Sequence, residues 1–182
     1  MGTRAPSDDQ PVLRHILVVG GTVAEWGALS PDRWSQRIDT LGAVAAHAGA
    51  SWLTLRPFER GADAESARPV HHDVVERDGC VVIVDPTADG RERLVVALRK
   101  LAETNHLTES AVATALLAPA ATEPDLVLVL DTGARLPESL VWELAYSELV
   151  YVPVAWADLE PQHLTDAIDA FHHRHRRFGG LD

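Results

Sequence analysis

The sequence predicts an α/β fold, in which a single layered domain has a largely parallel central sheet flanked by helices. Three short apolar runs are rich in β-branched residues and do not alternate with polar ones, as is typical of parallel strands buried on both faces. These runs are Ile16–Val19, Cys80–Val84 and Leu126–Leu130. Helical patterns lie between them, and strands that alternate with helices indicate a parallel sheet. The length of 182 residues suits one domain.

Shorter patterns predict the remaining elements. Residues 1–12 are polar and contain two prolines, so we expect a flexible tail before a domain that spans 13–182. Trp52–Leu55 and Leu149–Val154 are weaker strand candidates. Amphipathic stripes predict three helices, the first of them with Ser30 as its N-cap. The stripes are Trp34, Ile38, Leu41, Ala45 and Ala48; Leu94, Leu98 and Leu101; and Leu164, Ile168 and Phe171.

Composition argues against several classes of function. With 16 Lys and Arg against 27 Asp and Glu, the net charge is −11, which repels the backbone of a nucleic acid. No apolar stretch approaches the roughly 18–20 residues of a membrane span, and the first residues lack the apolar region of a signal peptide. Because Cys80 is the only cysteine, no internal disulfide can form, and the cytoplasm is the expected compartment.

Candidate site residues follow the predicted strands, since open parallel sheets bind ligands beyond the carboxyl ends of their strands. Gly20-Gly21-Thr22 follows the first run and has no carboxylate; it could let backbone N–H groups approach a phosphate, or form a plain tight turn. Asp85 and Asp131 follow the next two runs and could bind a metal, act as bases or cap turns. Glu148, on a helix expected over Trp142–Leu149, could reach a metal or lie at a polar helix end.

One cationic cluster, His172–Arg177, ends the last predicted helix of this acidic chain. Basic residues at that position can complement the helix dipole while facing solvent. Alternatively, their guanidinium groups can bind a diphosphate. Composition alone favours the first interpretation.

A longer set of segments carries a family resemblance. The segments are Pro124–Leu126, Arg135-Leu136, Leu140–Leu149, Trp156 and Arg176–Gly180, with weaker similarity at His15, Trp26, Leu53–Leu55 and Phe58. Together they resemble the cis-prenyltransferases, the family of undecaprenyl and dehydrodolichyl diphosphate synthases. Members of that family use Mg²⁺ to condense an allylic diphosphate with isopentenyl diphosphate. The resemblance implies the undecaprenyl diphosphate synthase fold over nearly the whole domain.

The same resemblance implies that the family's catalytic centre is missing here. The family carries the motif Asp-Gly-Asn-Gly-Arg-Trp after its first strand. With Trp26 aligned to the Trp of the motif, Gly21 stands at the Asp and Glu25 at the phosphate-binding Arg. A carboxylate at that Arg position would repel a diphosphate. The long middle helices that line the family's product tunnel also look shortened or missing. We therefore expect no catalytic residue and no cofactor site in this chain.

Other parts of the family's site look similar in this chain. Arg177 and Gly179 resemble the family's Arg-x-Gly tail, which crosses the dimer interface to the partner's isopentenyl diphosphate site. Arg135 aligns with a kept substrate-binding position, and Glu148 with a metal-binding Glu. A kept tail combined with a lost Asp motif is the pattern of the Nogo-B receptor type of subunit, which Val84–Gly90 also resembles.

The resemblance therefore implies a non-catalytic accessory subunit of a heteromeric cis-prenyltransferase. Its partner would be a catalytic paralogue in a heterodimer or larger assembly, which holds the Mg²⁺ and shares an isopentenyl diphosphate site with this chain. The complex would lie in the cytoplasm, or at the membrane surface through the partner or the product. Two alternatives stay open: a divergent homodimeric prenyl-diphosphate transferase or terpene synthase acting through Asp85, Asp131 or Glu148, and a scaffold without prenyl chemistry.

Overall fold

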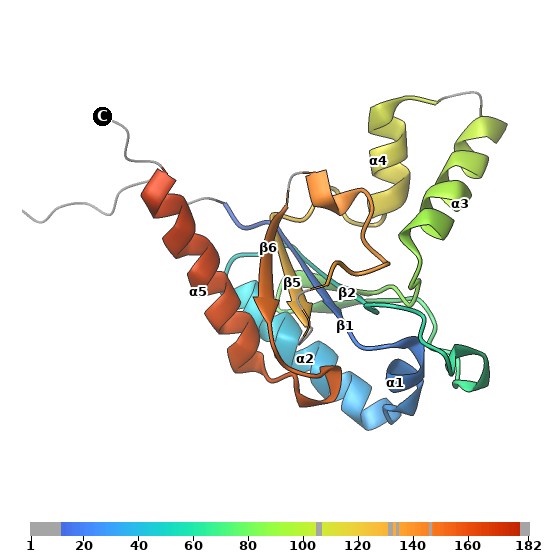
Figure 1. Ribbon diagram of the computed structural model, residues 1–182. Helices are drawn as coiled ribbons and strands as arrows, with labels where there is room; N and C mark the ends of the chain where they lie inside the picture. Colours follow the sequence, from blue (N-terminus) through green and yellow to red (C-terminus); the bar gives the residue numbers. More distant parts are fainter. Residues whose placement is uncertain (1–11, 105–106, 131–132, 134, 146, 179–182) are drawn as a thin grey trace, which may run out of the picture.

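The computed structural model describes residues 12–104, 107–130, 133, 135–145 and 147–178. Of these, residues 175–178 are described by their backbone alone. Its centre is a six-stranded sheet in the order β3-β4-β2-β1-β5-β6, with helices on both faces (Figure 1). The strands are β1 His15–Gly20, β2 Trp52–Arg56, β3 Asp73–Arg77, β4 Cys80–Val84, β5 Leu126–Leu130 and β6 Glu148–Val152. All neighbouring strands pair in parallel except β3, which is antiparallel to β4. The predicted fold class is therefore confirmed.

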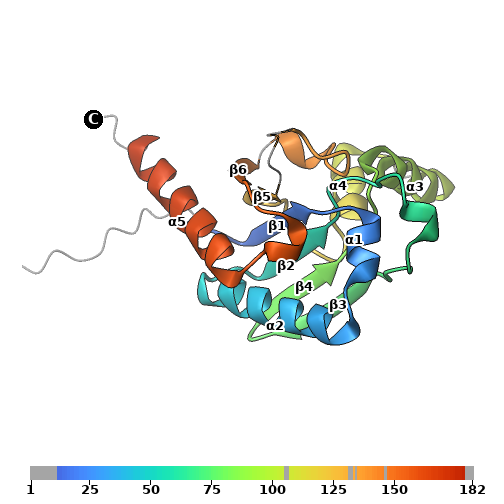
Figure 2. The same cartoon turned by 60° about the horizontal axis from the view of Figure 1, so that its bottom comes forward.

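Helices pack on the two faces of this sheet. The α-helices are α1 Val23–Ala28, α2 Pro31–His47, α3 Gly90–Glu103, α4 Glu109–Leu117 and α5 Pro161–Phe178, and the 3-10 helices are η1 Ala64–Ser66, η2 Glu143–Ala145 and η3 Trp156–Asp158. α2 and α5 cover one face, and α3 and α4 stand over the other (Figures 1 and 2). Alternate residues of β1 divide between them: Ile16 and Val18 belong to the larger apolar core, and Leu17 and Val19 to a smaller one. None of the helices in the described ranges is long and apolar enough to cross a membrane.

Local sequence signals account for most of these elements. α2 begins where predicted, because the Ser30 hydroxyl accepts a hydrogen bond from the Arg33 N–H (3.3 Å) and Pro31 occupies the first turn. The three apolar runs and the weaker candidate Trp52–Leu55 lie in strands, whereas the candidate Leu149–Val154 is a strand only as far as Val152. β3 was not predicted; it forms a hairpin with β4 through Asp78 and Gly79, which both adopt positive φ.

One predicted helix is wrong. Trp142–Leu149 is not a single helix, because η2 covers only Glu143–Ala145 and Glu148 is the first residue of β6. The residues from Leu149 to Val152 are aliphatic or aromatic, and they pair in register with β5 from Val127 to Leu130. Sheet pairing thus outweighs the helical pattern of the preceding residues.

The two ends of α5 lie at opposite edges of the sheet: one at the carboxyl ends of the parallel strands, the other at their amino ends. α5 follows η3, whose Trp156 side chain lies against Gly21 at the carboxyl end of β1. Near its other end, Arg174 Nη1 lies 3.1 Å from the Glu148 carboxylate. Glu148 is in register with Leu126, and Leu126 with Ile16, so this contact lies at the amino edge of the parallel strands. Over its 18 residues, about 27 Å, α5 runs from the carboxyl edge back to the amino edge.

Candidate functional site

A pocket of about 200 Å³ opens at the carboxyl ends of β1 and β5, the predicted location of a site. The loop after β2 joins it, because the Phe58 N–H donates to the Gly21 carbonyl (2.7 Å) and the Glu138 N–H donates to the Phe58 carbonyl (3.0 Å). The side chains and backbone that matter for its chemistry belong to Gly21, Thr22, Glu25, Glu59, Arg135 and Trp156.

Gly21 is held in a conformation and a space that suit glycine. Its φ is +72°, and a Cβ atom at this position would lie 2.8 Å from both Cβ and Cγ of Trp156. Trp156 cannot easily move, because it is buried and its ring stacks on Trp26 with centroids 5.1 Å apart. Trp26 is fixed in turn by the hydrogen bond from its Nε1–H to the Gly20 carbonyl (2.8 Å). The position that aligns with the family's Asp is therefore packed around the absence of a side chain.

We expect Gly21→Asp to destabilise the fold by about 3 kcal/mol, and not to create a metal site, because it adds both backbone strain and a steric clash with Trp156. Gly79→Asp is the matched control: Gly79 also has positive φ (+88°), but a Cβ there would meet nothing within 4 Å. The control should cost about 1 kcal/mol. Chemical denaturation measures both values, and equal losses in the two variants would contradict the packing argument.

The residue that aligns with the family's phosphate-binding Arg serves the fold instead. Glu25 accepts a hydrogen bond from the Thr22 N–H through its carboxylate (2.7 Å), and its own N–H donates to the Thr22 hydroxyl (3.2 Å). This reciprocal capping box starts α1. The Glu25 carboxylate therefore occupies a backbone donor that a phosphate would otherwise use, and adds a negative charge at the same place.

Arg135, the predicted substrate-binding residue, does line this pocket. Its Nη1 lies 3.2 Å from a Glu59 carboxylate oxygen, and its guanidinium lies over the Phe58 ring at 4.9 Å. Two carboxylates, Glu25 and Glu59, thus face one guanidinium in the described lining. Both acids already have partners, and within the described ranges no three His, Cys, Asp or Glu side chains come close enough to share a metal ion. These residues do not fit a Mg²⁺ site.

Among the other predicted site residues, Glu148 lies away from this pocket. Glu148 stands at the amino edge beside Arg174, four to five residues along the sheet register from the level of Gly20 and Gly21. At about 3.3 Å per residue this is roughly 15 Å. The α5 backbone reaches this edge too, while the Arg177 side chain and Gly179 lie outside the described residues.

A buried ion network, which the sequence did not reveal, lies between the sheet and α3. Arg56 Nε lies 3.1 Å from Asp85, and Arg56 Nη1 lies 2.6 Å from Glu143. Arg93 lies 3.4 Å from the same Asp85 oxygen and 2.9 Å from the same Glu143 oxygen. Each side chain is at most 15% exposed. Two cations and two anions therefore share a nearly dry site.

The charges in this network shift several pKa values. Burial raises the pKa of Glu143, but Arg56 and Arg93 outweigh it and hold that pKa at about 2. Burial raises the pKa of Asp85 as well, and the same two guanidinium groups hold it below its ordinary value. His15 lies nearby between the Thr54 hydroxyl (2.9 Å) and the Thr122 carbonyl (2.7 Å), and burial lowers its pKa to about 4. At neutral pH the carboxylates of Asp85 and Glu143 are ionised and His15 is neutral.

The network occupies the space between the sheet and α3 and α4. The cavity that borders His15, Arg56 and Glu143 holds only about 20 Å³, close to the volume of one water molecule. A wider groove of about 310 Å³ between α3 and α4 ends on Asp85 and Arg93. A hydrocarbon chain could not pass deeper without separating buried ion pairs, which costs several kcal/mol.

Asp85 and Glu148, two of the three carboxylates of the enzyme alternative, lie far apart. Asp85 belongs to the network after β4, Glu148 stands at the amino edge of β6, and Asp131 lies outside the described residues. The sequence patterns do not predict a site role for Arg56, Arg93 or Glu143. The sequence holds one indication of the buried network: Arg56 is a charged residue directly after the strand candidate that ends with Leu53–Leu55.

A family model and individual relatives both show similarity to prenyl-transferring enzymes. Residues 64–179 match the family described as "Putative undecaprenyl diphosphate synthase". An isoprenyl transferase of Lactococcus lactis is 31% identical over 146 residues, which are 76% of this chain and 56% of the relative. An isoprenyl transferase of Bacillus subtilis is 30% identical over 134 residues, which are 64% of this chain and 52% of the relative. The chain thus spans about half the length of these curated relatives.

A solved structure shares the fold. The crystal structure of a probable undecaprenyl diphosphate synthase from Campylobacter jejuni superposes with a TM-score of 0.61 at 15% identity, covering 90% of this chain and 97% of that one. At this identity the similarity concerns the fold alone.

Proposed function

We propose, from the premise that this chain belongs to the undecaprenyl diphosphate synthase family of cis-prenyltransferases, that it is a non-catalytic accessory subunit. In this proposal it associates with a catalytic paralogue, in the cytoplasm or at the membrane surface through that partner or the product, and supplies Arg177 and Gly179 to the partner's isopentenyl diphosphate site. The partner holds the Mg²⁺. Relatives named isoprenyl transferase are consistent with polyprenyl diphosphate synthesis as the activity of the complex.

The observation that carries this proposal is the direction of α5. Its last turns lie at the amino edge of the sheet beside Glu148, whereas the chain's own strand-end pocket lies at the carboxyl edge. The α5 backbone thus ends far from the chain's own pocket, which favours a role of its basic C-terminal residues in a neighbouring subunit. Arginine suits that role, because its planar guanidinium forms paired hydrogen bonds with phosphate oxygens.

The state of the strand-end pocket supports the non-catalytic part of the proposal. Gly21 is packed against Trp156, Glu25 caps α1, and Arg135 is paired with Glu59. The buried ion network between the sheet and α3 also leaves little room for a growing hydrocarbon product. These features favour an accessory subunit over a divergent homodimeric transferase.

Prenyl transfer from farnesyl and isopentenyl diphosphates with Mg²⁺ tests the proposal. The reaction is run with this chain alone, with a candidate synthase from the same genome alone, and with both after co-expression. We expect turnover only, or at least tenfold more, when both chains are present. Turnover by this chain alone would instead indicate a homodimeric enzyme, and a synthase whose rate and stability ignore this chain would indicate a scaffold without prenyl chemistry.

A further inference from the structure

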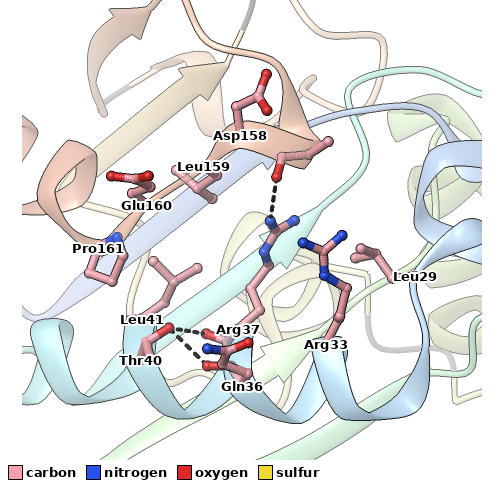
Figure 3. A pocket seen from close by; sticks show the side chains of 11 residues that line it. Leu29, Arg33, Gln36, Arg37, Thr40, Leu41, Asp158, Leu159, Glu160 and Pro161 are labelled. Atoms are coloured by element: carbon pink, nitrogen blue, oxygen red, sulfur yellow. Dashed lines mark hydrogen bonds between the residues drawn. The ribbon is translucent and has the colours of Figure 1, made fainter.

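A second cavity, of about 500 Å³, lies between α2 and the segment that joins η3 to α5. It carries two arginines, Arg33 and Arg37, one turn apart on α2. Figure 3 shows both guanidinium groups at the same level, directed from α2 towards the η3 segment. Leu29, Leu41 and Leu159 contribute apolar surface. The volume is in the usual range of small-molecule sites.

Contacts within the protein hold the Arg37 side chain in place, but they leave one of its hydrogen-bond donors without an acceptor among the described residues. Its Nη2–H donates to the Ala157 carbonyl (3.3 Å), and its guanidinium lies 4.3 Å from the centre of the Trp156 ring. Its Nη1 is buried and has no hydrogen-bond acceptor among the described residues. A buried donor of a charged group left without an acceptor is destabilising, so an acceptor from outside the chain would complete the arrangement.

The pair of arginines is not explained by the stability of α2. Like charges four residues apart on a helix repel each other, and cations near a helix N-terminus oppose the helix dipole. Burial and the charge of Arg33 lower the pKa of Arg37. Neither guanidinium pairs with a carboxylate in the described part of the chain. Asp158 and Glu160 also line the cavity, but Figure 3 shows their carboxylates directed away from the two guanidinium groups.

We propose that this cavity is a second anion site, in which Arg33 and Arg37 bind the phosphoryl oxygens of a phosphate or diphosphate group. Two guanidinium groups on one side of a cavity match an anion with several oxygens better than a single carboxylate. Trp156 separates this site from the strand-end pocket, since its ring contacts Arg37 and its Cβ lies against Gly21. The site is independent of the tail at the other end of α5, and therefore of the accessory role proposed above.

The test is titration of the full-length chain with inorganic diphosphate or with isopentenyl diphosphate, in chelator and without Mg²⁺, by calorimetry and by tryptophan fluorescence. Trp156 lies under Arg37 and should report binding. We expect saturable binding with a Kd below about 1 mM. Arg33→Gln and Arg37→Gln should each weaken it about tenfold or more, and Arg37→Lys should weaken it as well, because lysine lacks the planar fork.

Arg91→Gln is the matched control, because the Arg91 side chain is 82% exposed on α3 and its loss removes the same charge. Binding should be unchanged in this variant. Equal affinity for the two probes would assign the site to the diphosphate group, and tighter binding of isopentenyl diphosphate would add a contribution from the leucines. Absence of binding, or equal affinities of the wild type, Arg33→Gln and Arg37→Gln, would overturn the proposal. Arg33 is exposed, so its variant stays informative even if Arg37→Gln is unstable.

Discussion

Replacing Arg177 by alanine is expected to lower the turnover of the complex with the catalytic partner by about 100-fold, while the two chains still assemble. The loss of one well-placed donor to a charged reacting group typically reduces turnover by 10²–10³. We expect a large loss of turnover for Arg177→Ala because the proposed function assigns the Arg177 side chain direct contact with a diphosphate. Steady-state rates with varied isopentenyl diphosphate, together with size-exclusion chromatography of the complex, measure both parts of this prediction.

Two further variants separate a substrate contact from a structural role of the tail. Arg91→Ala removes an exposed arginine from α3 and should leave turnover unchanged. Arg174→Ala breaks the ion pair with Glu148 at the amino edge, 3.1 Å across, and reports on the anchoring of α5 itself. If Arg177→Ala leaves the rate unchanged, the basic tail is a solvated helix end and the proposed trans contribution fails. If it abolishes assembly, its role is in the interface.

The sequence predicts the layers of this fold better than its site. Runs such as Leu126–Leu130 are apolar throughout, and only a strand covered on both faces buries them completely, so the parallel sheet follows from local pattern. The segment from Trp142 to Leu149 shows the limit of that reasoning. Its helical spacing is real, but pairing of β6 with β5 depends on residues about twenty positions away in the sequence.

The candidate site also has features that the sequence predicts and features that it does not. That Gly21 and Glu25 lack the family's chemistry could be read from the sequence by alignment on Trp26. That Trp156 fills the space beside Gly21 could not be predicted from the sequence, because the two positions are 135 apart in the numbering and no periodicity links them. The buried network is invisible for the same reason, since Arg56, Asp85 and Glu143 come from three separate segments that the topology brings together.

Replacing Glu143 by alanine is expected to destabilise the fold by about 3–5 kcal/mol, the largest loss of stability that we predict. Its side chain is 1% exposed and pairs with both Arg56 and Arg93, so its removal leaves two buried guanidinium groups with one carboxylate between them. Glu143→Gln should cost less, because the amide oxygen can still accept a hydrogen bond. Chemical denaturation at pH 7 measures both. Glu76→Ala is the matched control: it removes an exposed glutamate from β3 and should change stability by less than about 0.5 kcal/mol.

The pH dependence of the difference between wild type and Glu143→Gln identifies its electrostatic part. The pKa of Glu143 is about 2 in the folded protein, against an ordinary value of 4.5 for the unfolded chain. The ionised carboxylate therefore contributes stability above about pH 5, and this contribution is lost as the pH falls through 4.5 towards 2. The full contribution is about 3 kcal/mol, at 1.36 kcal/mol for each pKa unit. The stability difference between the two proteins should therefore narrow by about 2 kcal/mol from pH 5 to pH 3. His15 titrates in both proteins and cancels in the comparison. A difference that stays constant with pH would mean that Glu143 stabilises the fold by packing, and that the arginines do not depend on its charge.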